Sequence, residues 1–211
     1  VKEFASGVTP MEVAKSISEG FARNVISASF NGTTVETTTP LTTDGSLILY
    51  TWNDEDGKKA FWHSTSHVMA QVLEQMYPGI KLTLGPAIAN GFYYDVDFEE
   101  HKITEADFKK IEDRVLEISR GKHEFKLRPV SKADALELYK DNVYKTEMIT
   151  NLEDGTITFC DHDTFTDLCR GGHIPNTGII KAMKIMSVDG AYWRGDEKNK
   201  QLTRVYGISF P

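Results

Sequence analysis

The segment Lys59–Tyr77 reads KAFWHSTSHVMAQVLEQMY, and it decides the fold of the central part of the chain. Its apolar residues recur at helical spacing, and at about 100° per residue several fall within one arc about 100° wide. These residues are Trp62, Met69, Val72, Leu73 and Met76. Pro78-Gly79 follows directly, and proline cannot continue a helix. The segment therefore predicts one amphipathic helix over residues 59–77.

The same helix carries two histidines, His63 and His67, outside its apolar arc. A spacing of four residues places both side chains on neighbouring turns of one face. The H-x-x-x-H spacing alone fits equally well two solvated histidines or two polar residues under a loop. It also lacks the glutamate of a zinc-protease helix, because Ser64 stands there. The pair predicts candidate site residues rather than core residues.

The residues before this helix predict a smaller, separate unit. The polar stretch Asn53–Lys59 has no apolar periodicity and marks a boundary. Further upstream, Thr9-Pro10-Met11-Glu12 opens a helix with a capping box and a proline at the first position, and Gly20 is its expected end. Three β-rich runs lie around the turn signals Asn31-Gly32 and Asp44-Gly45; they are Val25–Phe30, Thr33–Glu36 and Ser46–Tyr50. A small sheet packed on one helix is predicted.

The residues after the helix predict a second α+β unit. A strand is expected through Gly91–Val96, and a helix from its cap Thr104 to Gly121, with Asp107 closing the capping box. Ser131 with Asp134 opens another helix, and strand-like pieces follow at Thr156–Cys160 and Ile179–Val188. The chain contains no internal repeat, so two α+β units in series are expected.

Composition narrows the classes of protein. The formal net charge of −7 over 211 residues argues against a general nucleic-acid coat, which needs clustered Lys and Arg. Two cysteines, Cys160 and Cys169, make no disulfide framework and fit a reducing compartment. No apolar run approaches a membrane span and no signal peptide is evident, so a cytoplasmic protein is expected. A start at Val1 without Met and a stop after a strand-like run suggest part of a longer polypeptide.

A second chemical cluster lies in Asp167-Leu-Cys-Arg-Gly-Gly-His173. Cys169 and His173 lie on either side of a Gly-Gly turn, so their side chains can converge on one point. Together with His63 and His67 they form a set able to bind tetrahedral zinc. The alternative for this cluster alone is a packed cysteine beside a loop histidine. The two clusters together are more informative than either one.

Four stretches of the chain resemble threonyl-tRNA synthetases of the bacterial type. They are His63-Ser-Thr-Ser-His67, Gly85-Pro-Ala-Ile-Ala-Asn-Gly-Phe-Tyr-Tyr-Asp-Val-Asp97, Asp167-Leu-Cys-Arg-Gly-Gly-His173 and Gly190-Ala-Tyr-Trp-Arg-Gly-Asp196. Alanyl-tRNA synthetase editing domains share the histidine and cysteine motifs, whereas Asn90–Tyr94 and Tyr192–Asp196 are similar to the threonyl family. The resemblance implies a ubiquitin-like β-grasp (TGS) domain over residues 1–53 and an α+β editing domain over residues 54–211.

This resemblance implies an aminoacyl-tRNA deacylase that hydrolyses serine wrongly esterified to tRNA(Thr). The partners would be the tRNA(Thr) acceptor end and the serine moiety, and editing would need no cofactor. It implies that ATP, Mg and zinc serve a synthetic site in a domain outside this sequence. The full-length ligase is expected to be a homodimer through that remainder, without membrane association.

The resemblance also implies roles for individual residues. His63 would lie near the terminal ribose, while His67, Cys169 and His173 would shape the pocket and its waters. Lys145 would position water or stabilise charge, although without the resemblance it reads as a surface lysine. The substrate-binding residues would be Asp167, holding the amino group, and Tyr94, lining the pocket. We expect His63→Ala and Lys145→Ala to reduce deacylation and to leave the fold intact, because neither residue is expected in an apolar arc.

Two departures and two alternatives accompany this interpretation. The family usually has proline where Gly172 stands, which predicts a looser loop before His173, and the first β-grasp strand is clipped. A zinc-dependent hydrolase or alanyl-type editing domain would use the two histidine and cysteine motifs as metal ligands. A non-catalytic RNA-binding or partner-binding module is the alternative of another class.

Overall fold

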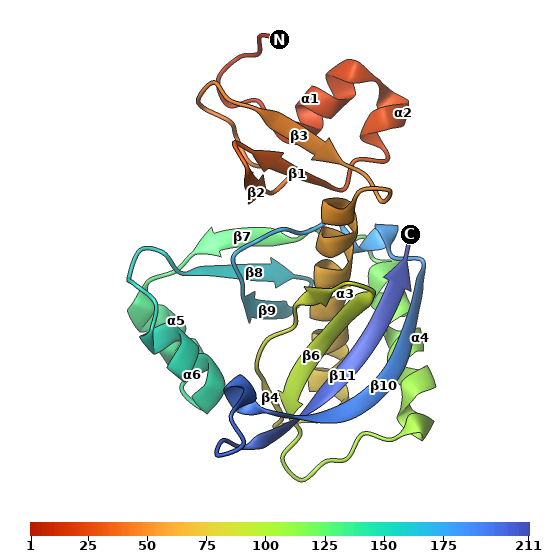
Figure 1. The fold of residues 1–211 in the computed structure, drawn as a ribbon, viewed down its shortest axis with the longest axis vertical. Helices are drawn as coiled ribbons and strands as arrows, with labels where there is room; N and C mark the ends of the chain where they lie inside the picture. Colours follow the sequence, from red (N-terminus) through yellow and green to blue (C-terminus); the bar gives the residue numbers. More distant parts are fainter.

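The computed structural model describes residues 1–211, beginning with a small unit of two short helices and one sheet (Figure 1). Helix α1 (Pro10–Ile17) is capped by Thr9, whose hydroxyl accepts the N–H of Glu12. The predicted end at Gly20 is wrong: α1 ends at Ile17, and Gly20 lies inside α2 (Glu19–Ala22), which Ser18 caps. The N-cap Ser18 therefore starts a second helix two residues before Gly20, so the glycine does not end a helix.

The sheet of this unit has three antiparallel strands in the order β2-β1-β3. They span Ser27–Phe30 (β1), Thr33–Val35 (β2) and Leu47–Tyr50 (β3). Asn31 and Gly32 both have positive φ and join β1 to β2 in a tight hairpin, as predicted. Asp44-Gly45 closes no hairpin, because β3 pairs with β1 instead of β2.

Helix α3 (Glu55–Met76) forms the axis of the larger unit. It starts four residues before the predicted position, since Asp54 is its N-cap and Glu55 and Asp56 occupy its first turn. Acidic residues there are favourable near the positive end of the helix dipole. The polar stretch predicted as a linker is thus largely helical. Most of α3 is buried on all sides rather than along one arc.

The main sheet of the larger unit packs against α3 and follows the order β10-β11-β6-β4, with β5 pairing with β6. Its strands are Lys81–Leu82 (β4), Ala87–Ile88 (β5), Gly91–Asp97 (β6), Ala182–Tyr192 (β10) and Gln201–Phe210 (β11). Helix α4 (Glu105–Ser119) has the predicted capping box of Thr104 and Asp107 and contacts both α3 and β10. Short 3-10 turns cover Thr177–Ile179 and Trp193–Gly195.

A second, three-stranded sheet in the order β7-β8-β9 lies on the other side of the α3 axis (Figure 1). It comprises Lys126–Pro129 (β7), Thr158–His162 (β8) and Phe165–Leu168 (β9). Helix α5 (Lys132–Leu138) starts at Ser131 as predicted, and α6 (Val143–Thr150) was not anticipated. The β8–β9 hairpin and α3 carry most of the polar groups described below.

The two units share one apolar core. Ile26 of the small unit belongs to the same buried cluster as Phe61 and Trp62 of α3. Trp52, at the junction, packs edge to face against Phe61, Trp62 and Phe210, with ring centroids 5.0, 5.8 and 5.9 Å apart. The fold is α+β, as predicted, with a β-grasp first unit. The division at residue 53 stays a prediction, because side chains on both sides of it pack together.

Candidate functional site

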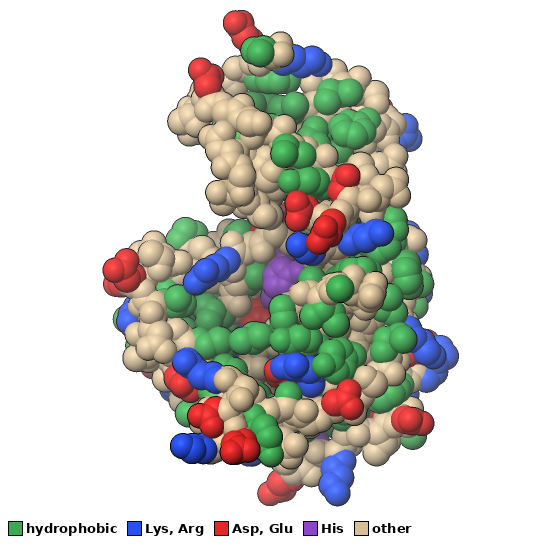
Figure 2. Space-filling model, in the orientation of Figure 1, with side chains coloured by type: hydrophobic (Ala, Val, Ile, Leu, Met, Phe, Trp, Pro, Cys, Tyr) green, Lys and Arg blue, Asp and Glu red, His purple; other side chains and the backbone are tan.

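A cleft of about 950 Å³ opens where the small unit meets the large one. Figure 2 shows histidine side chains at its base, in the hollow between the two units. Thr34 of the small unit lines one wall, and Gly85 and the Asp167–Gly172 segment line others. Three cations, Lys59, Arg170 and Arg194, also line the cleft and form its cationic border, beside Asp56. Lys59 is paired with Glu55 at 3.3 Å and Arg194 with Glu147 at 3.0 Å, so Arg170 is the cation without an ion pair.

Ser64 and Ser66, two of the three hydroxyl residues between His63 and His67, fix the surroundings of the cleft, whereas Thr65 contacts Ser209 of β11 at 2.7 Å. Ser64 Oγ accepts the N–H of Ile174, the residue after His173, at 2.9 Å. Ser66 Oγ donates to the carbonyl of Gly85 at 2.8 Å, and Gly85 faces His63. All three hydroxyl residues are buried. The sequence analysis gave these residues no role, although three consecutive small hydroxyl residues inside a buried helix are a usable signal.

The cleft cluster consists of His63, His67, Cys169 and His173, which the structure brings together as predicted. His63 Nε2 lies 3.1 Å from Cys169 Sγ and 3.3 Å from His67 Nε2. Cys169 Sγ lies 3.3 Å from His173 Nε2. His63 and Cys169 are partly exposed, whereas His67 and His173 are buried. His63 and Cys169 are therefore the more open members of the cluster, His67 also lines the cleft, and His173 lies beneath them.

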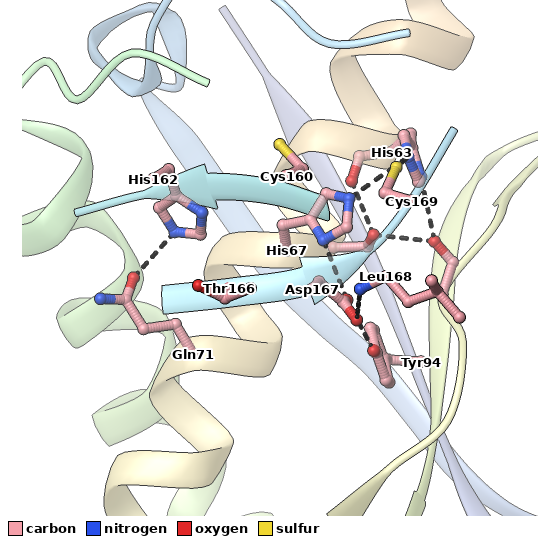
Figure 3. A network of polar contacts seen from close by, with 12 residues as sticks. His63, His67, Gln71, Tyr94, Cys160, His162, Thr166, Asp167, Leu168 and Cys169 are labelled. Atoms are coloured by element: carbon pink, nitrogen blue, oxygen red, sulfur yellow. Dashed lines mark hydrogen bonds and ion pairs between the residues drawn. The ribbon is translucent and has the colours of Figure 1, made fainter. Parts of the chain in front are cut away.

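Asp167, Lys145 and Tyr94 are buried and form the carboxylate layer. Figure 3 shows Asp167 and Tyr94 beneath His67. Asp167 Oδ2 accepts the hydroxyl of Tyr94 at 2.7 Å and lies 3.1 Å from His67 Nδ1. Its Oδ1 accepts the N–H of Leu168 at 2.8 Å and a hydrogen bond from Lys145. Both carboxylate oxygens are thus occupied within the protein, and the carboxylate fixes the orientation of His67.

The placement of Lys145 and Tyr94 differs from the expectation. Lys145 is 2 % exposed, so it is neither a surface lysine nor on the main cleft. It borders a second cleft of about 480 Å³ on the other side of Asp167. Tyr94 is fully buried, because the backbone at Gly85 lies against its ring, and it supports Asp167 instead of lining the cleft. The short helix α6, capped by Asn142, points Lys145 inward.

Burial and charge act in opposite directions in this site. Burial alone would raise the pKa of Asp167, but the ammonium of Lys145 and the contact with His67 hold it below its ordinary value. Burial likewise opposes charge on Cys169 and on the two buried histidines. Mutual attraction prevails: the pKa of the Cys169 thiol is well below normal, and the pKa values of His67 and His173 are raised. The site favours a thiolate among imidazolium groups.

A residue of the small unit, Glu36, completes the surroundings of the cluster, and sequence reasoning missed it. Its carboxylate accepts the N–H of Gly172 at 2.7 Å and lies 3.2 Å from His173 Nδ1. Gly172 has a φ of 90°, which proline cannot adopt, and its N–H is a donor that proline lacks. Glycine in place of the family's proline thus allows the hydrogen bond from Gly172 to Glu36. The looser loop stays a prediction.

The donor types of the cleft cluster suit zinc, but their spacing fits only in part. Imidazole nitrogens and a thiolate are common tetrahedral zinc ligands, and such ligands lie roughly 3.3–3.6 Å from one another. Three contacts in the cluster are close to that separation, whereas all four ligand atoms fit only within 4.8 Å of one another. Binding a metal would require at least one side chain to move inward.

Comparisons with known proteins match both units. Residues 1–51 match the model of the TGS domain, and residues 156–206 match that of the threonyl and alanyl tRNA synthetase second additional domain. The chain is 86% identical over 211 residues to a threonine–tRNA ligase of Flavobacterium johnsoniae and 54% over 213 residues to that of Parabacteroides distasonis. Each match covers 100% of this chain and 33% of the relative. The chain thus spans a third of the length of these curated relatives.

None of its helices has the length and apolar character of a membrane span.

Proposed function

We propose that this chain is part of a threonyl-tRNA synthetase and that residues 54–211 form its editing domain. The matches to the TGS and second additional domain models and the 86% identity to one third of a threonine–tRNA ligase support this proposal. The reaction is hydrolysis of the ester in seryl-tRNA(Thr). One observation carries the proposal: a histidine and a cysteine, backed by two further histidines and a buried carboxylate, converge at the base of an open cleft with a cationic border. A site of this kind suits an anionic substrate with a reactive ester.

Serine is the proposed amino acid because of its size. A synthetic site shaped for threonine cannot exclude serine sterically, and one missing methyl group is worth only about 1–3 kcal/mol of discrimination. A second, hydrolytic site that excludes the larger threonine supplies the remainder. The proposal therefore requires the editing cleft to admit a seryl ester and to reject a threonyl ester.

The border of the cleft would hold the acceptor end of tRNA(Thr). Lys59 and Arg170 are charged side chains at the opening, and Arg194 lies nearby, held by Glu147 at 3.0 Å. Phosphate contacts by such residues give affinity and orientation without reading sequence. Few such residues are needed if other parts of the full-length protein hold the rest of the tRNA.

Hydrolysis needs an attacking water, stabilisation of the oxyanion and a proton for the leaving ribose oxygen. In the proposed arrangement His63 is nearest the ribose, because it is a partly exposed member of the cleft cluster and its Nδ1 faces the carbonyl of Gly85. Donation of Nδ1–H there leaves Nε2 as an acceptor, and a ribose hydroxyl would bind it by replacing its contacts with Cys169 Sγ and His67 Nε2. Cys169 accepts the proton of the water, and the imidazolium of His67 supplies a proton to the leaving oxygen.

The carboxylate layer would act from beneath the reacting atoms. Asp167 can hold the substrate's amino group only if that group displaces Lys145 or another donor, because both of its oxygens are occupied. Lys145 would compensate the charge of Asp167, and Tyr94 would hold that carboxylate in register with His67. The full-length protein would in addition aminoacylate tRNA(Thr) with ATP, and its Mg, zinc and homodimeric assembly belong to the same proposal.

The decisive experiment compares deacylation of seryl-tRNA(Thr) and threonyl-tRNA(Thr). Both esters are incubated with the 211-residue chain and with the full-length ligase that contains it. Selective loss of the seryl ester supports the proposal. Absence of cleavage above the buffer rate in both preparations contradicts it and favours a non-catalytic binding module.

A zinc-dependent hydrolase is the second candidate, since the four ligand-type side chains of the cleft cluster lie together. A bound zinc ion would polarise the ester and lower the pKa of a water. Metal analysis and activity after treatment with a chelator separate the two candidates. Full seryl-ester hydrolysis in a zinc-free preparation excludes the metal mechanism, whereas activity restored only by zinc establishes it.

A further inference from the structure

Glu36 belongs to the small unit, yet its side chain is directed into the larger one. It follows β2 directly, and its side chain is only 12 % exposed. One carboxylate oxygen accepts the N–H of Gly172 at 2.7 Å and the other accepts the N–H of His173 at 3.3 Å. Both backbone donors belong to the larger unit. A buried carboxylate is stable only with such partners, so this contact is part of how the two units dock.

The loop that Glu36 holds has an unusual backbone. Gly171 and Gly172 both have positive φ, at 114° and 90°, and this conformation turns consecutive N–H groups toward one point. A Cβ at Gly171 would lie 2.8 Å from the carboxylate of Glu36, so only glycine allows this approach. Neither Gly172 nor His173 donates its backbone N–H to a partner within the larger unit. The conformation of the loop therefore depends on an acceptor from outside its own unit.

Glu36 also contacts the imidazole of His173. Glu36 Oε1 lies 3.2 Å from Nδ1, whereas Nε2 on the other side of the ring lies 3.3 Å from Cys169 Sγ. Phe125 stacks on the same ring at a centroid distance of 5.2 Å and an interplanar angle of 8°. Stacking fixes the plane of the ring, and the Glu36 carboxylate, which lies closer to Nδ1 than Cys160 Sγ does at 3.7 Å, accepts Nδ1–H and fixes the rotation of the ring. Together they direct Nε2 at Cys169.

We propose that Glu36 is a positioning residue for the deacylation site: by binding the Gly172–His173 loop and His173 Nδ1, it makes the site dependent on the docked first unit. This inference rests on the proposed function. The reason is geometric. Thr34 lines the cleft from the same segment, and the apolar cluster that belongs to the small unit alone is small, with three buried residues, Ala14, Ala22 and Val25. Its position therefore depends on contacts with the larger unit, among which Glu36 reaches closest to the cleft cluster.

The test uses Glu36→Ala and Glu36→Gln, with Asp44→Ala as matched control. Asp44 is an exposed carboxylate of the same unit with no side-chain hydrogen bond or ion pair. Imidazole nitrogen NMR of the 211-residue chain reports the protonation state and environment of His173. Deacylation of seryl-tRNA(Thr) by the full-length ligase gives kcat and KM separately.

Glu36→Ala is expected to shift the His173 resonances and to lower kcat by about tenfold to a hundredfold, the usual effect of removing an orienting partner. KM for the tRNA should change less than about twofold, because Glu36 contacts no cationic border residue. Glu36→Gln, which retains one acceptor oxygen, should lie between Glu36→Ala and the wild type. Asp44→Ala should match the wild type in both measurements.

Two outcomes would overturn the inference. His173 resonances that stay unchanged in Glu36→Ala show that the carboxylate does not orient the ring, even if thermal stability falls. A shift of these resonances without a decrease in kcat, in an otherwise active ligase, shows that the orientation does not matter for the reaction. If the wild-type ligase itself fails to cleave the seryl ester, the proposed function fails, while the NMR comparison still tests the contact.

Discussion

Helix α3 and the β8–β9 hairpin carry buried polar groups at two places, and the two places behave in opposite ways (Figure 3). One is the cleft cluster with its carboxylate layer. The other, the far cluster, consists of Gln71, His162 and Asp163. His162 Nε2 lies 2.9 Å from the Gln71 carbonyl oxygen, and the Gln71 amide donates to Asp163 at 2.9 Å. His162 is 2 % exposed, and its Nδ1 has no partner.

The difference lies in the groups that face each histidine. His67 faces a thiol and a carboxylate, and its pKa is raised in spite of burial. His162 faces a neutral amide and lies between Phe125 and Phe165, and burial lowers its pKa to about 3. A buried histidine is therefore not by itself a site. The anionic partners and the opening to the cleft make the cleft cluster chemically competent.

The largest effect is expected from Lys145→Met, which leaves the buried Asp167 without its cation. Breaking a buried ion pair in this way costs about 3–5 kcal/mol of unfolding free energy, and deacylation should fall with it. Urea unfolding and the deacylation rate measure the two effects. This replaces the expectation that the fold stays intact, which was based on a lysine outside any apolar arc; the lysine is 2 % exposed and paired with Asp167.

The double variant Lys145→Met with Asp167→Asn is the control for that prediction. It removes both charges, so it should recover part of the lost stability but not the activity. Stability of the double variant at or below that of Lys145→Met would show that the ion pair is not the cause. The stability of the carboxylate layer would then not depend on its ion pair, and this difference from the far cluster would be lost.

His63→Ala should reduce deacylation by about 10²-fold or more, the usual contribution of a positioned proton-transfer group. Its unfolding free energy should change by less than about 1–2 kcal/mol, because His63 is only partly buried. The matched variant in the far cluster, His162→Ala, should show the converse: reduced stability and an unchanged rate for the folded protein. Equal losses of rate in both variants would erase the distinction between the clusters.

The far cluster should make stability depend on pH in the acidic range. Because the pKa of His162 is about 3 when folded and 6.5 in the reference state, only the unfolded chain takes up this proton between those values. Stability should therefore fall as pH decreases from about 6.5 toward 3, by at most about 1.4 kcal/mol per pH unit from this residue. Urea unfolding of the wild type and of His162→Gln at several pH values measures this dependence. The unfolding free energy of the variant should change less with pH than that of the wild type. Parallel slopes would contradict a neutral, buried His162.

The smallest effect is expected at the open border of the cleft. Arg170→Ala should raise KM for seryl-tRNA(Thr) a few-fold, with a weaker dependence on salt and little change in kcat, because an exposed cation adds only about one phosphate contact. Lys110→Ala removes an exposed cation of α4 and serves as the control. A similar rise in KM for both variants would indicate a general charge effect instead of a binding surface.

Local sequence signals predicted much of the fold, but not where its elements end. Thr9 and Thr104 cap the predicted helices because a hydroxyl oxygen can accept a free N–H within its own segment. Gly20 failed as a terminator because Ser18 starts α2 before it. Asn53–Lys59 was predicted as a linker because it lacks apolar periodicity, although Asp54 and the acidic first turn mark a helix start.

The sequence by itself determined which groups were available: two histidines one helical turn apart, a cysteine and a histidine joined by two glycines, and caps that place them. Only the tertiary structure decided what those groups do. It buried Lys145 against Asp167, kept Tyr94 out of the cleft and brought Glu36 to His173 across more than a hundred residues of chain. The reason is physical: capping and periodicity act between near neighbours, whereas burial and charge pairing depend on partners that only the folded chain brings together.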